Sequence, residues 1–452
     1  MSLQAETAAG TAPAARTGPV LPVLMTATFM TSLDFFIVNV AMPSLRTELH
    51  AGTAQLQWVV AGFGLALAAG LITGGRLGDL YGRRRVFAAG LALFTAASLV
   101  CGVAPGPGVL IAGRVLQGLG AALIQPQVLA ILRTSFHGPA QGKAFSVYGL
   151  TLGLGAVFGQ LIGGVLIQLL DWRWVFLINL PIGIVALVLA RRIPESADPS
   201  ARLDPVGAVL VTTALAGLVL PLIEGREQGR PAWTWLSLAG SAVLFAVFVT
   251  YERRRASPLV DMTLFRERAF TVGLAAQLVY FLGMASYFLI LALYLQDGLG
   301  LTALESGTAF LAIGIGYMGT SMVAHLLKER LGRQVIAAGA LIMVAGLALM
   351  YAAAGHGIGP LLPGMAVDGI GMGMALAPLT TTILERVTPR HAGAAGGVLS
   401  AFTQVGNALG VALIGIVFYH FTDITDGFRE GLLALIVLEL VLAGVIQFLP
   451  RR

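Results

Sequence analysis

The sequence predicts an all-α polytopic membrane protein that crosses the bilayer fourteen times, and three observations lead to this fold class. Hydrophobic residues make up 57% of the 452 residues and charged residues only 11%, which is too little polar surface to cover a soluble body of this length. Each of fourteen apolar segments is long enough to cross the hydrocarbon core, which takes about 17 to 25 helical residues. Parts of the first half of the chain also recur in the second half.

The predicted spans follow one another closely, and the longest loop between them is the basic segment 251–268. Loops of this length leave no room for a soluble catalytic or nucleotide-binding domain, so the chain is not expected to be an enzyme or to bind nucleic acid. The spans are 19–43, 55–75, 86–104, 108–132, 144–169, 174–190, 205–224, 235–251, 269–295, 303–326, 335–354, 360–383, 393–420 and 430–449.

The positive charges predict the orientation of the chain. An even number of spans places both termini on one side, and most of the 28 Lys and Arg residues are cytoplasmic if that side is the cytoplasm. Residues 1–18 have nothing to bury and are expected to form a disordered cytoplasmic tail. The first apolar segment is too long for a signal-peptide core and contains Asp34, so we expect no cleavage.

The composition also predicts the location and excludes some kinds of site. Only Lys143 and Lys328 among the basic residues are Lys, and Ala and Gly are abundant, which suggests a bacterium with a GC-rich genome. We therefore expect a multi-pass protein of the bacterial cytoplasmic (inner) membrane. The single Cys101 cannot build a disulfide framework or a thiolate metal site, and neither a cofactor nor a metal ion is expected.

An internal repeat predicts two similar bundles. Three residues shortly after the second span, Asp79, Gly82 and Arg83, align with Glu329, Gly332 and Arg333. We predict an N-terminal six-helix bundle over 19–192, two extra helices with cytoplasmic linkers over 193–268, and a C-terminal six-helix bundle over 269–452. Parallel repeats of this kind place a substrate path at their interface, near the middle of the bilayer. Further along, Gly142, Gly155 and Gly159 align with Gly393, Gly406 and Gly410.

Four motifs resemble the signature motifs of a known transporter family. They are LDFFIVNVAMP (33–43), GGRLGDLYGRRR (74–85), RVLQGLGAA (114–122) and GLTLGLGAVFGQLIGG (149–164), in the first, second, fourth and fifth predicted helices or directly after them. The chain resembles the major facilitator superfamily, and in particular its fourteen-helix drug:proton antiporter branch. DWRWVFLINLPIG (171–183) is also typical of that branch.

The resemblance implies the major facilitator fold and an exporter that works by alternating access. It implies that lipophilic and perhaps cationic drugs or antibiotics leave the cytoplasm in exchange for protons. Where the antiporter motif of this family usually has Pro after its glycine, this chain has Gln160. Besides its small-molecule substrate and protons, the expected partner is membrane lipid, and the chain is expected to be a monomer.

Three ionisable residues within predicted spans are candidates for proton coupling. Asp34 lies about fifteen residues into the first helix, near the middle of the bilayer, and Arg114 of the fourth helix is its natural countercharge. We hypothesise that Asp34 exchanges a proton and competes with substrate for Arg114 or for a shared cavity; the alternative is a static pair that holds helices together. Asp368 in VDGIGMGMA is either a second proton or cationic-substrate site, or a structural polar contact.

Asp79 and Arg83 are expected on the cytoplasmic loop after the second helix, and this basic segment is a candidate cytoplasmic gate. Glycine there permits a tight turn, and a carboxylate among guanidinium groups can lock one conformation and release another. The alternative is that the arginines only set the topology. In the second bundle LKERLGRQ (327–334) has one arginine at the position of the cluster, so we expect latching to be weaker there. The gate residues are Asp79, Gly82, Arg83 and Arg84.

Two further groups of residues are expected at the substrate path. Glycines of the fifth helix let helix backbones approach closely, for packing alone or for gating specific to antiport; this group, with its neighbour, is Gly149, Gly153, Gly155, Gly159, Gln160, Gly163 and Gly164. The candidates for lining the cavity are polar, aromatic or Met side chains, which could equally contact neighbouring helices or lipid. They are Asn39, Gln125, Gln277, Tyr280, Phe281, Met284, Tyr287, Gln404 and Asn407.

Two other functions remain open from the sequence. A metabolite or lipid carrier of the same fold would use Asp34 differently, and a membrane sensor would transport nothing, although little extramembrane sequence is left to relay a signal. The segment GPAQGKA (138–144) has the wrong spacing for a phosphate-binding loop, lacks its Ser or Thr and follows no strand, so ATP is not the expected energy source.

Overall fold

The structure is a computed structural model, which describes residues 20–197, 204–227, 231–255, 262–385, 387 and 392–450. These residues form helices and connecting segments, with no strand among them. The predicted tail 1–18 and parts of the predicted linkers lie outside the described residues. The helices before the linker are α1 (Val20–Glu48), α2 (Thr53–Tyr81), α3 (Arg83–Gly102), α4 (Pro107–Ser135), α5 (Pro139–Leu169), α6 (Trp174–Leu177) and α7 (Asn179–Ala190).

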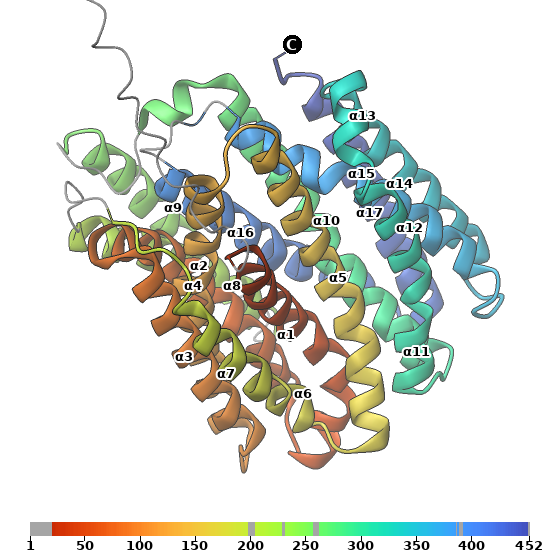
Figure 1. The fold of residues 1–452 in the computed structure, drawn as a ribbon. Helices are drawn as coiled ribbons and strands as arrows, with labels where there is room; N and C mark the ends of the chain where they lie inside the picture. Colours follow the sequence, from red (N-terminus) through yellow and green to blue (C-terminus); the bar gives the residue numbers. More distant parts are fainter. Residues whose placement is uncertain are drawn as a thin grey trace, which may run out of the picture.

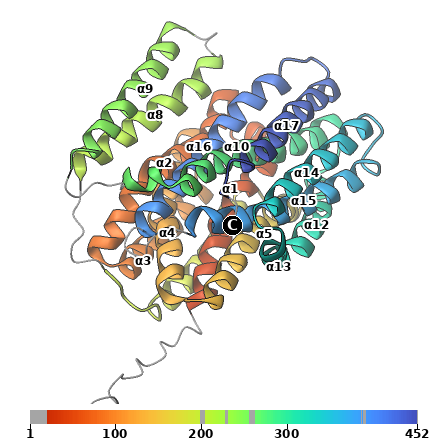
Figure 2. The same ribbon diagram turned by 90° about the horizontal axis from the view of Figure 1, so that it is seen from above.

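The two helices in the middle of the chain form a pair at the edge of the molecule. They are α8 (Pro205–Glu227) and α9 (Ala232–Glu252). Figure 2 shows this pair beside α2, and α8 packs against both α2 and α9. Half of the side chains of α9 are exposed in the isolated chain, as expected of a helix whose outer face meets lipid.

The remaining elements form the second half of the bundle. The polypeptide continues through η1 (Met262–Arg266), α10 (Arg268–Leu293), η2 (Tyr294–Gly298), α11 (Ala303–Ala309), α12 (Leu311–Ser321), α13 (Ala324–Leu331), α14 (Gln334–Ala353), α15 (Leu361–Leu384), α16 (Ala392–Phe418) and α17 (Ile424–Ile446). Figure 1 shows α13 and the C terminus at the upper end of the molecule, and α6 and α11 at the opposite end.

The described helices agree with a polytopic membrane protein. Nine of them are long and apolar enough to cross a membrane, and the number is up to eleven if two bent pairs each count as one span. One pair is Trp58–Leu71 with Thr73–Tyr81, bent by 49°, and the other is Ala303–Ser321 with Ala324–Leu331, bent by 53°. The apolar helices Trp174–Ala190 and Pro205–Leu218 are shorter, so the total of fourteen spans remains a prediction.

The helices pack as two sets that meet along α5 and α16. Within the first set α1 packs on α5, and α4 packs on both α2 and α3; within the second, α10 packs on α16, and α15 on both α12 and α14. Between the sets, α5 contacts α11, α12 and α15, while α16 contacts α2 and α4. Figure 2 shows both sets side by side in a view from above.

The repeated glycines play the same packing role in the two sets. A Cβ added to Gly155 of α5 would lie 2.6 Å from the Cβ of Ser32 on α1, so α5 and α1 are in close contact there. A Cβ at Gly406 of α16 would lie 2.8 Å from the carbonyl oxygen of Leu278 on α10. Because α16 packs on α10 as α5 packs on α1, the sequence repeat corresponds to a repeated arrangement of helices.

Candidate transport site

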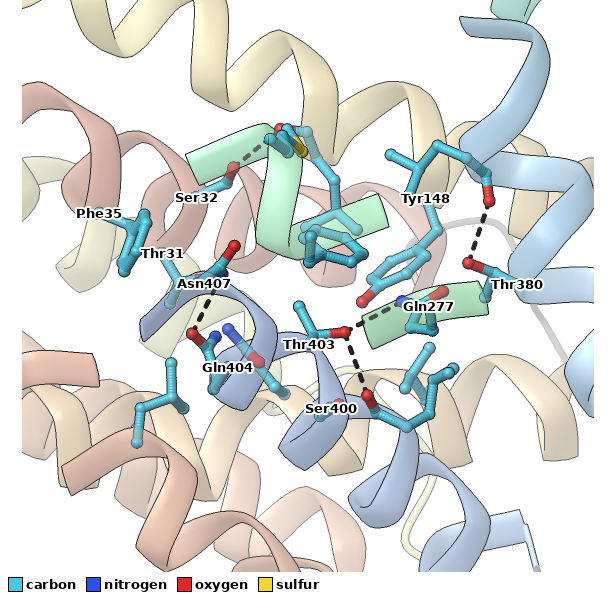
Figure 3. A pocket seen from close by; sticks show the side chains of 18 of the residues that line it. Thr31, Ser32, Phe35, Tyr148, Gln277, Thr380, Ser400, Thr403, Gln404 and Asn407 are labelled. Carbon is cyan, nitrogen blue, oxygen red and sulfur yellow. Dashed lines mark hydrogen bonds between the residues drawn. The ribbon is translucent and has the colours of Figure 1, made fainter. Parts of the chain in front are cut away.

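A cavity lies between the two sets of helices, and none of the described residues that line it carries a formal charge. It lies among α1, α2, α4, α5, α10, α15 and α16. Figure 3 shows its hydroxyl and amide side chains, with Gln404 and Asn407 on one wall and Tyr148 and Gln277 nearby. The lining residues are Thr31, Ser32, Phe35, Phe36, Phe63, Leu67, Gln125, Leu129, Tyr148, Leu152, Gln277, Phe281, Met284, Leu376, Thr380, Leu399, Ser400, Thr403, Gln404 and Asn407.

The structure divides the predicted cavity residues into two groups. Those on the cavity wall are Gln125, Gln277, Phe281, Met284, Gln404 and Asn407. Three others are not among the lining residues: Asn39, Tyr280 and Tyr287 are buried elsewhere. Hydroxyl residues such as Thr31, Ser400 and Thr403 were not predicted, because a single Ser or Thr in an apolar helix has no pattern of its own in the sequence.

Two residues of the cavity wall each have an amide oxygen without a hydrogen-bond partner among the described residues. Gln277 Nε2 donates a hydrogen bond of 3.0 Å to Thr403 Oγ1, and Asn407 Nδ2 donates one of 3.3 Å to Gln404 Oε1 (Figure 3). The other amide atoms, Gln277 Oε1 and Asn407 Oδ1, are buried and have no hydrogen-bond partner among the described residues. Since an unpaired buried acceptor is unfavourable, both oxygens would gain from a donor group on a bound molecule.

Asp34 and Arg114 form a fully buried ion pair beside the cavity. Arg114 Nη1 donates to Asp34 Oδ2, and both side chains have 0% exposure. Asp34 Oδ1 accepts two more hydrogen bonds, one of 2.9 Å from Gln117 Nε2 and one of 2.7 Å from Asn179 Nδ2. The carboxylate of Asp34 thus accepts hydrogen bonds from one guanidinium and two amides.

The guanidinium of Arg114 is held from three further directions. Its Nε donates 2.9 Å to the carbonyl oxygen of Val59, and Nη1 donates 2.9 Å to Gln117 Oε1. Its central carbon lies 4.4 Å from the ring centroid of Phe63, which is a cavity-lining residue, in a cation–π contact. Arg114 Nη2 has no partner among the described residues. Phe63 therefore separates the ion pair from the cavity.

The sequence identified both charged members of this centre but missed its amides. Gln117 lies one helical turn after Arg114 on α4, and that spacing is a signal that could have been used. Asn179 lies at the start of α7, in the motif segment 171–183, and is fully buried. Its contact with Asp34 joins helices far apart in the sequence, which a local pattern does not reveal.

The predicted gate segment is shorter than expected. The sequence led us to expect Asp79 and Arg83 in a loop, but that is wrong: Asp79 lies in the last turn of α2, and Arg83 is the first residue of α3. Only Gly82 separates the helices, and its φ of +103° is a conformation that other residues rarely adopt. A single glycine thus replaces the predicted loop.

The charged side chains of the gate segment, residues 79–84, contact one another and the segment after α7. Arg83 Nη2 lies 2.8 Å from Asp79 Oδ1, and both residues are buried. Glu195 Oε1 accepts a hydrogen bond of 3.0 Å from the backbone N–H of Arg84, and Glu195 Oε2 lies 3.5 Å from Arg84 Nε. The sequence analysis did not single out Glu195, an isolated acid after a span. All of these contacts lie within the first set of helices.

The second copy of the gate segment, residues 327–334, makes fewer polar contacts than the first. Gly332 again ends a helix with positive φ, at +57°. Glu329 is exposed, and it makes no ion pair within the part of the chain that the structure describes. Arg333 Nη1 donates to the carbonyl oxygen of Leu449.

The glycines of α5 face in two directions. Gly155, Gly159 and Gly163 pack against α1, and Gln160 Nε2 donates 3.2 Å to the carbonyl oxygen of Phe36 on the same helix. The other group faces the second set of helices: Gly149 packs on Ala377 of α15, Gly153 on the ring of Tyr317 of α12, and Gly164 on Ala303 of α11. Tyr317 Oη also donates 2.5 Å to the carbonyl oxygen of Gly149.

The third predicted proton-coupling residue lies apart from the first two. Asp368 is on α15, in the second set of helices, with 1% exposure, and it is not a lining residue of the cavity. Among the described residues, no group of three or more His, Cys, Asp and Glu side chains is placed to hold a metal ion.

Comparison with known sequences gives consistent matches. A family model described as "Major Facilitator Superfamily" matches residues 24–411. A probable actinorhodin transporter of Streptomyces coelicolor is 40% identical over 430 residues, covering 91% of this chain and 74% of that protein. The puromycin resistance protein pur8 of Streptomyces alboniger is 37% identical, covering 88% and 81%. The cephamycin export protein CmcT of Amycolatopsis lactamdurans is 35% identical, covering 94% and 92%.

Solved structures agree in fold. The human organic anion transporter MFSD10 superposes with a TM-score of 0.69 at 15% identity, covering 95% of this chain and 99% of that one. The proton:xylose symporter XylE superposes with a TM-score of 0.67 at 15% identity, covering 96% and 95%. At this identity the likeness concerns the fold alone.

Proposed function

Because the chain belongs to the Major Facilitator Superfamily, we propose that it exports an antibiotic-like small molecule across a bacterial cytoplasmic membrane in exchange for protons. It is a membrane transporter, not an enzyme. The names of these three relatives concern antibiotic transport, resistance and export. We extend that role to this chain, with alternating access between the two sets of helices as the transport cycle.

The observation that supports the substrate class is the uncharged cavity wall. Four phenylalanines provide apolar and aromatic surface, while hydroxyls and amides provide hydrogen bonds. Among the described lining residues there is no charged side chain to neutralise a formal charge on the substrate. We therefore propose a lipophilic, largely uncharged substrate with N–H or O–H groups that reach Gln277 Oε1 and Asn407 Oδ1.

The proton would be carried by Asp34. In the ionised state its carboxylate holds Arg114, and protonation would remove that attraction and release the guanidinium. Substrate in the cavity would press on Phe63 and so act on Arg114. Substrate binding and protonation of Asp34 would then be mutually exclusive. An inward proton supplies about 2.3 kcal/mol per 100 mV and about 1.4 kcal/mol per pH unit.

The proposed orientation places both termini and the Asp79–Arg83 segment in the cytoplasm, following the excess of Lys and Arg at that level. At the same end, Arg133 Nη1 of α4 donates 3.4 Å to the carbonyl oxygen of Leu384 on α15, a contact between the two sets that opening would break. We propose the bundles 19–192 and 269–452, with the pair α8 and α9 between them, as the moving units of a monomer in lipid.

Export can be tested in inverted membrane vesicles that hold a proton gradient. Chloramphenicol, puromycin and ethidium are added separately, and dissipation of the gradient is followed by a pH-sensitive dye. We expect dissipation by chloramphenicol or puromycin and little by the permanent cation ethidium, with none in vesicles that lack the protein. If neither chloramphenicol nor puromycin has an effect in vesicles containing the inserted protein, the proposed substrate class is wrong.

A further inference from the structure

A row of three aromatic rings crosses from the first set of helices to the second beside the cavity. The ring centroid of Phe36 on α1 lies 5.1 Å from that of Phe288 on α10, and Phe288 lies 5.4 Å from Phe310, the residue between α11 and α12. The exposed fractions of these side chains are 6%, 0% and 0%. Rings at these separations are in direct contact, so this aromatic row bridges the two sets.

The aromatic row lies at one end of the cavity. Phe36 is the last of the described lining residues along α1, and Phe288 comes one helical turn after Met284, the last of them along α10. In the proposed orientation both helices run outward. Helix α10 leads through η2 to α11, which Figure 1 shows at the opposite end of the molecule from α13 and the C terminus. The aromatic row therefore covers the side of the cavity that would face the outside.

Neighbouring residues pack behind the first ring of the row. A Cβ at Gly159 of α5 would lie 3.3 Å from the Cβ of Phe36, so the backbone of α5 supports that residue. Phe36 also meets Phe35 edge to face, with ring centroids 5.0 Å apart. Because side chains packed in this way have no free space to turn into, the contact between Phe36 and Phe288 opens only when helices move.

Small residues close the same end of the interface next to the aromatic row. A Cβ at Gly307 of α11 would lie 2.7 Å from the carbonyl oxygen of Gln160 on α5. A Cβ at Gly314 of α12 would lie 2.8 Å from Cγ1 of Val157, also on α5. Helix α5 is thus in close contact with α11 and α12 where the aromatic row joins α1 to α10. A molecule in the cavity leaves on this side only if the two sets separate here.

We propose that Phe36 and Phe288 form the outer gate of the transport path, and that an exported molecule leaves the cavity past Phe36 once the two rings have separated. Phe36 serves both parts of the path, because it lines the cavity and makes the gate contact. Helix α1 also carries Asp34, two residues before Phe36, so the buried ion pair and the gate belong to one helix. The direction of passage rests on the proposed function, whereas the gate contact itself does not.

Side-specific cysteine labelling tests the gate without any substrate. The reporter is Gln125→Cys on the cavity wall, and a charged thiol reagent that does not cross membranes is added outside right-side-out vesicles. We expect slow labelling of the reporter alone. Adding Phe288→Ala removes the central ring of the row and should accelerate labelling by about tenfold or more, because the outward-open state becomes more populated. Each protein is also labelled without the reporter, to measure any contribution from the buried Cys101.

A matched variant on the same helix separates the gate from lost packing. Phe270 is also buried, but it lies near the start of α10 and its ring contacts Phe265. Phe270→Ala should therefore leave labelling from the outside unchanged. Phe36→Ala removes the other half of the gate contact and should accelerate labelling as Phe288→Ala does. If thermal unfolding shows that Phe288→Ala fails to fold, Phe36→Ala carries the test.

A second reporter checks the orientation separately. Glu329→Cys, at an exposed residue that we propose to be cytoplasmic, should react in inverted vesicles and not in right-side-out ones. Unchanged outside labelling in both Phe36→Ala and Phe288→Ala would overturn the gate, and so would equal acceleration by Phe270→Ala. Reversed labelling of Glu329→Cys would overturn its assignment to the outside. Because no step of this experiment requires export, failure of the gate is distinguished from failure of the proposed function.

Discussion

Arg114 lies with its guanidinium over the ring of Phe63, 4.4 Å from the ring centroid, while Phe63 forms part of the cavity wall. One aromatic ring thus contacts both the proposed substrate path and the buried ion pair with Asp34. This contact joins the cavity wall to the buried ion pair.

We expect Phe63→Leu to weaken coupling more than it weakens folding. Leucine has no aromatic ring and so loses the cation–π contact with Arg114. A bound substrate would then have less effect on the position of Arg114. Proton release from purified protein on adding an exported compound should fall by about fivefold or more. Phe87→Leu, at a buried site of α3 away from the cavity, is the control for lost packing. Equal effects of the two changes would argue against the link.

A negative charge in the cavity should change which molecules are exported. Gln125 lines the uncharged wall, so Gln125→Glu would supply the missing countercharge for a cation. We expect ethidium export to rise by about tenfold, ~1.4 kcal/mol, while export of uncharged compounds declines. Gln125→Leu removes the amide without adding charge and should not gain ethidium export. If both variants export ethidium equally, charge does not set specificity.

The glycines of α5 should differ in importance according to what they face. A methyl group at Gly153 would overlap the ring of Tyr317 on the opposite set of helices, so Gly153→Ala should disfavour this closed contact and slow transport by about tenfold or more. Gly142→Ala is the matched control on the same helix, since a Cβ there meets nothing within 4 Å. Transport rates in vesicles with equal amounts of protein check this difference. Similar rates would mean that the contact is not part of the cycle.

The two copies of the gate segment should be unequal. Asp79→Asn leaves the buried Arg83 without its charge partner, which costs about 3 to 5 kcal/mol when a buried pair is broken. Glu329→Gln changes an exposed residue and should stay within about 0.5 kcal/mol. Thermal unfolding and transport are measured for both variants. A larger loss from Glu329→Gln would refute this assignment.

Much of the fold could be predicted from the sequence because lipid demands long apolar helices, and these are visible in the composition. The pairing of Asp34 with Arg114 was also predictable, since two opposite charges buried in separate helices need each other.

The cavity wall was only partly predictable for a geometric reason. Helix α10 has two polar or aromatic faces, and the sequence does not say which of them meets the substrate path. Tyr280 and Gln277 are one turn apart, yet only Gln277 lines the cavity. The single-residue turn at Gly82 was missed because helix ends extend beyond the apolar segment into polar residues such as Asp79.

The central claim is that Asp34 carries the exchanged proton. It is tested most directly in proteoliposomes with an internal pH dye, by comparing the unaltered protein with Asp34→Asn. We predict that Asp34→Asn, correctly inserted, loses proton movement driven by an exported compound and loses uphill export, but still exchanges labelled for unlabelled compound. Normal compound-driven proton movement in Asp34→Asn would contradict the account.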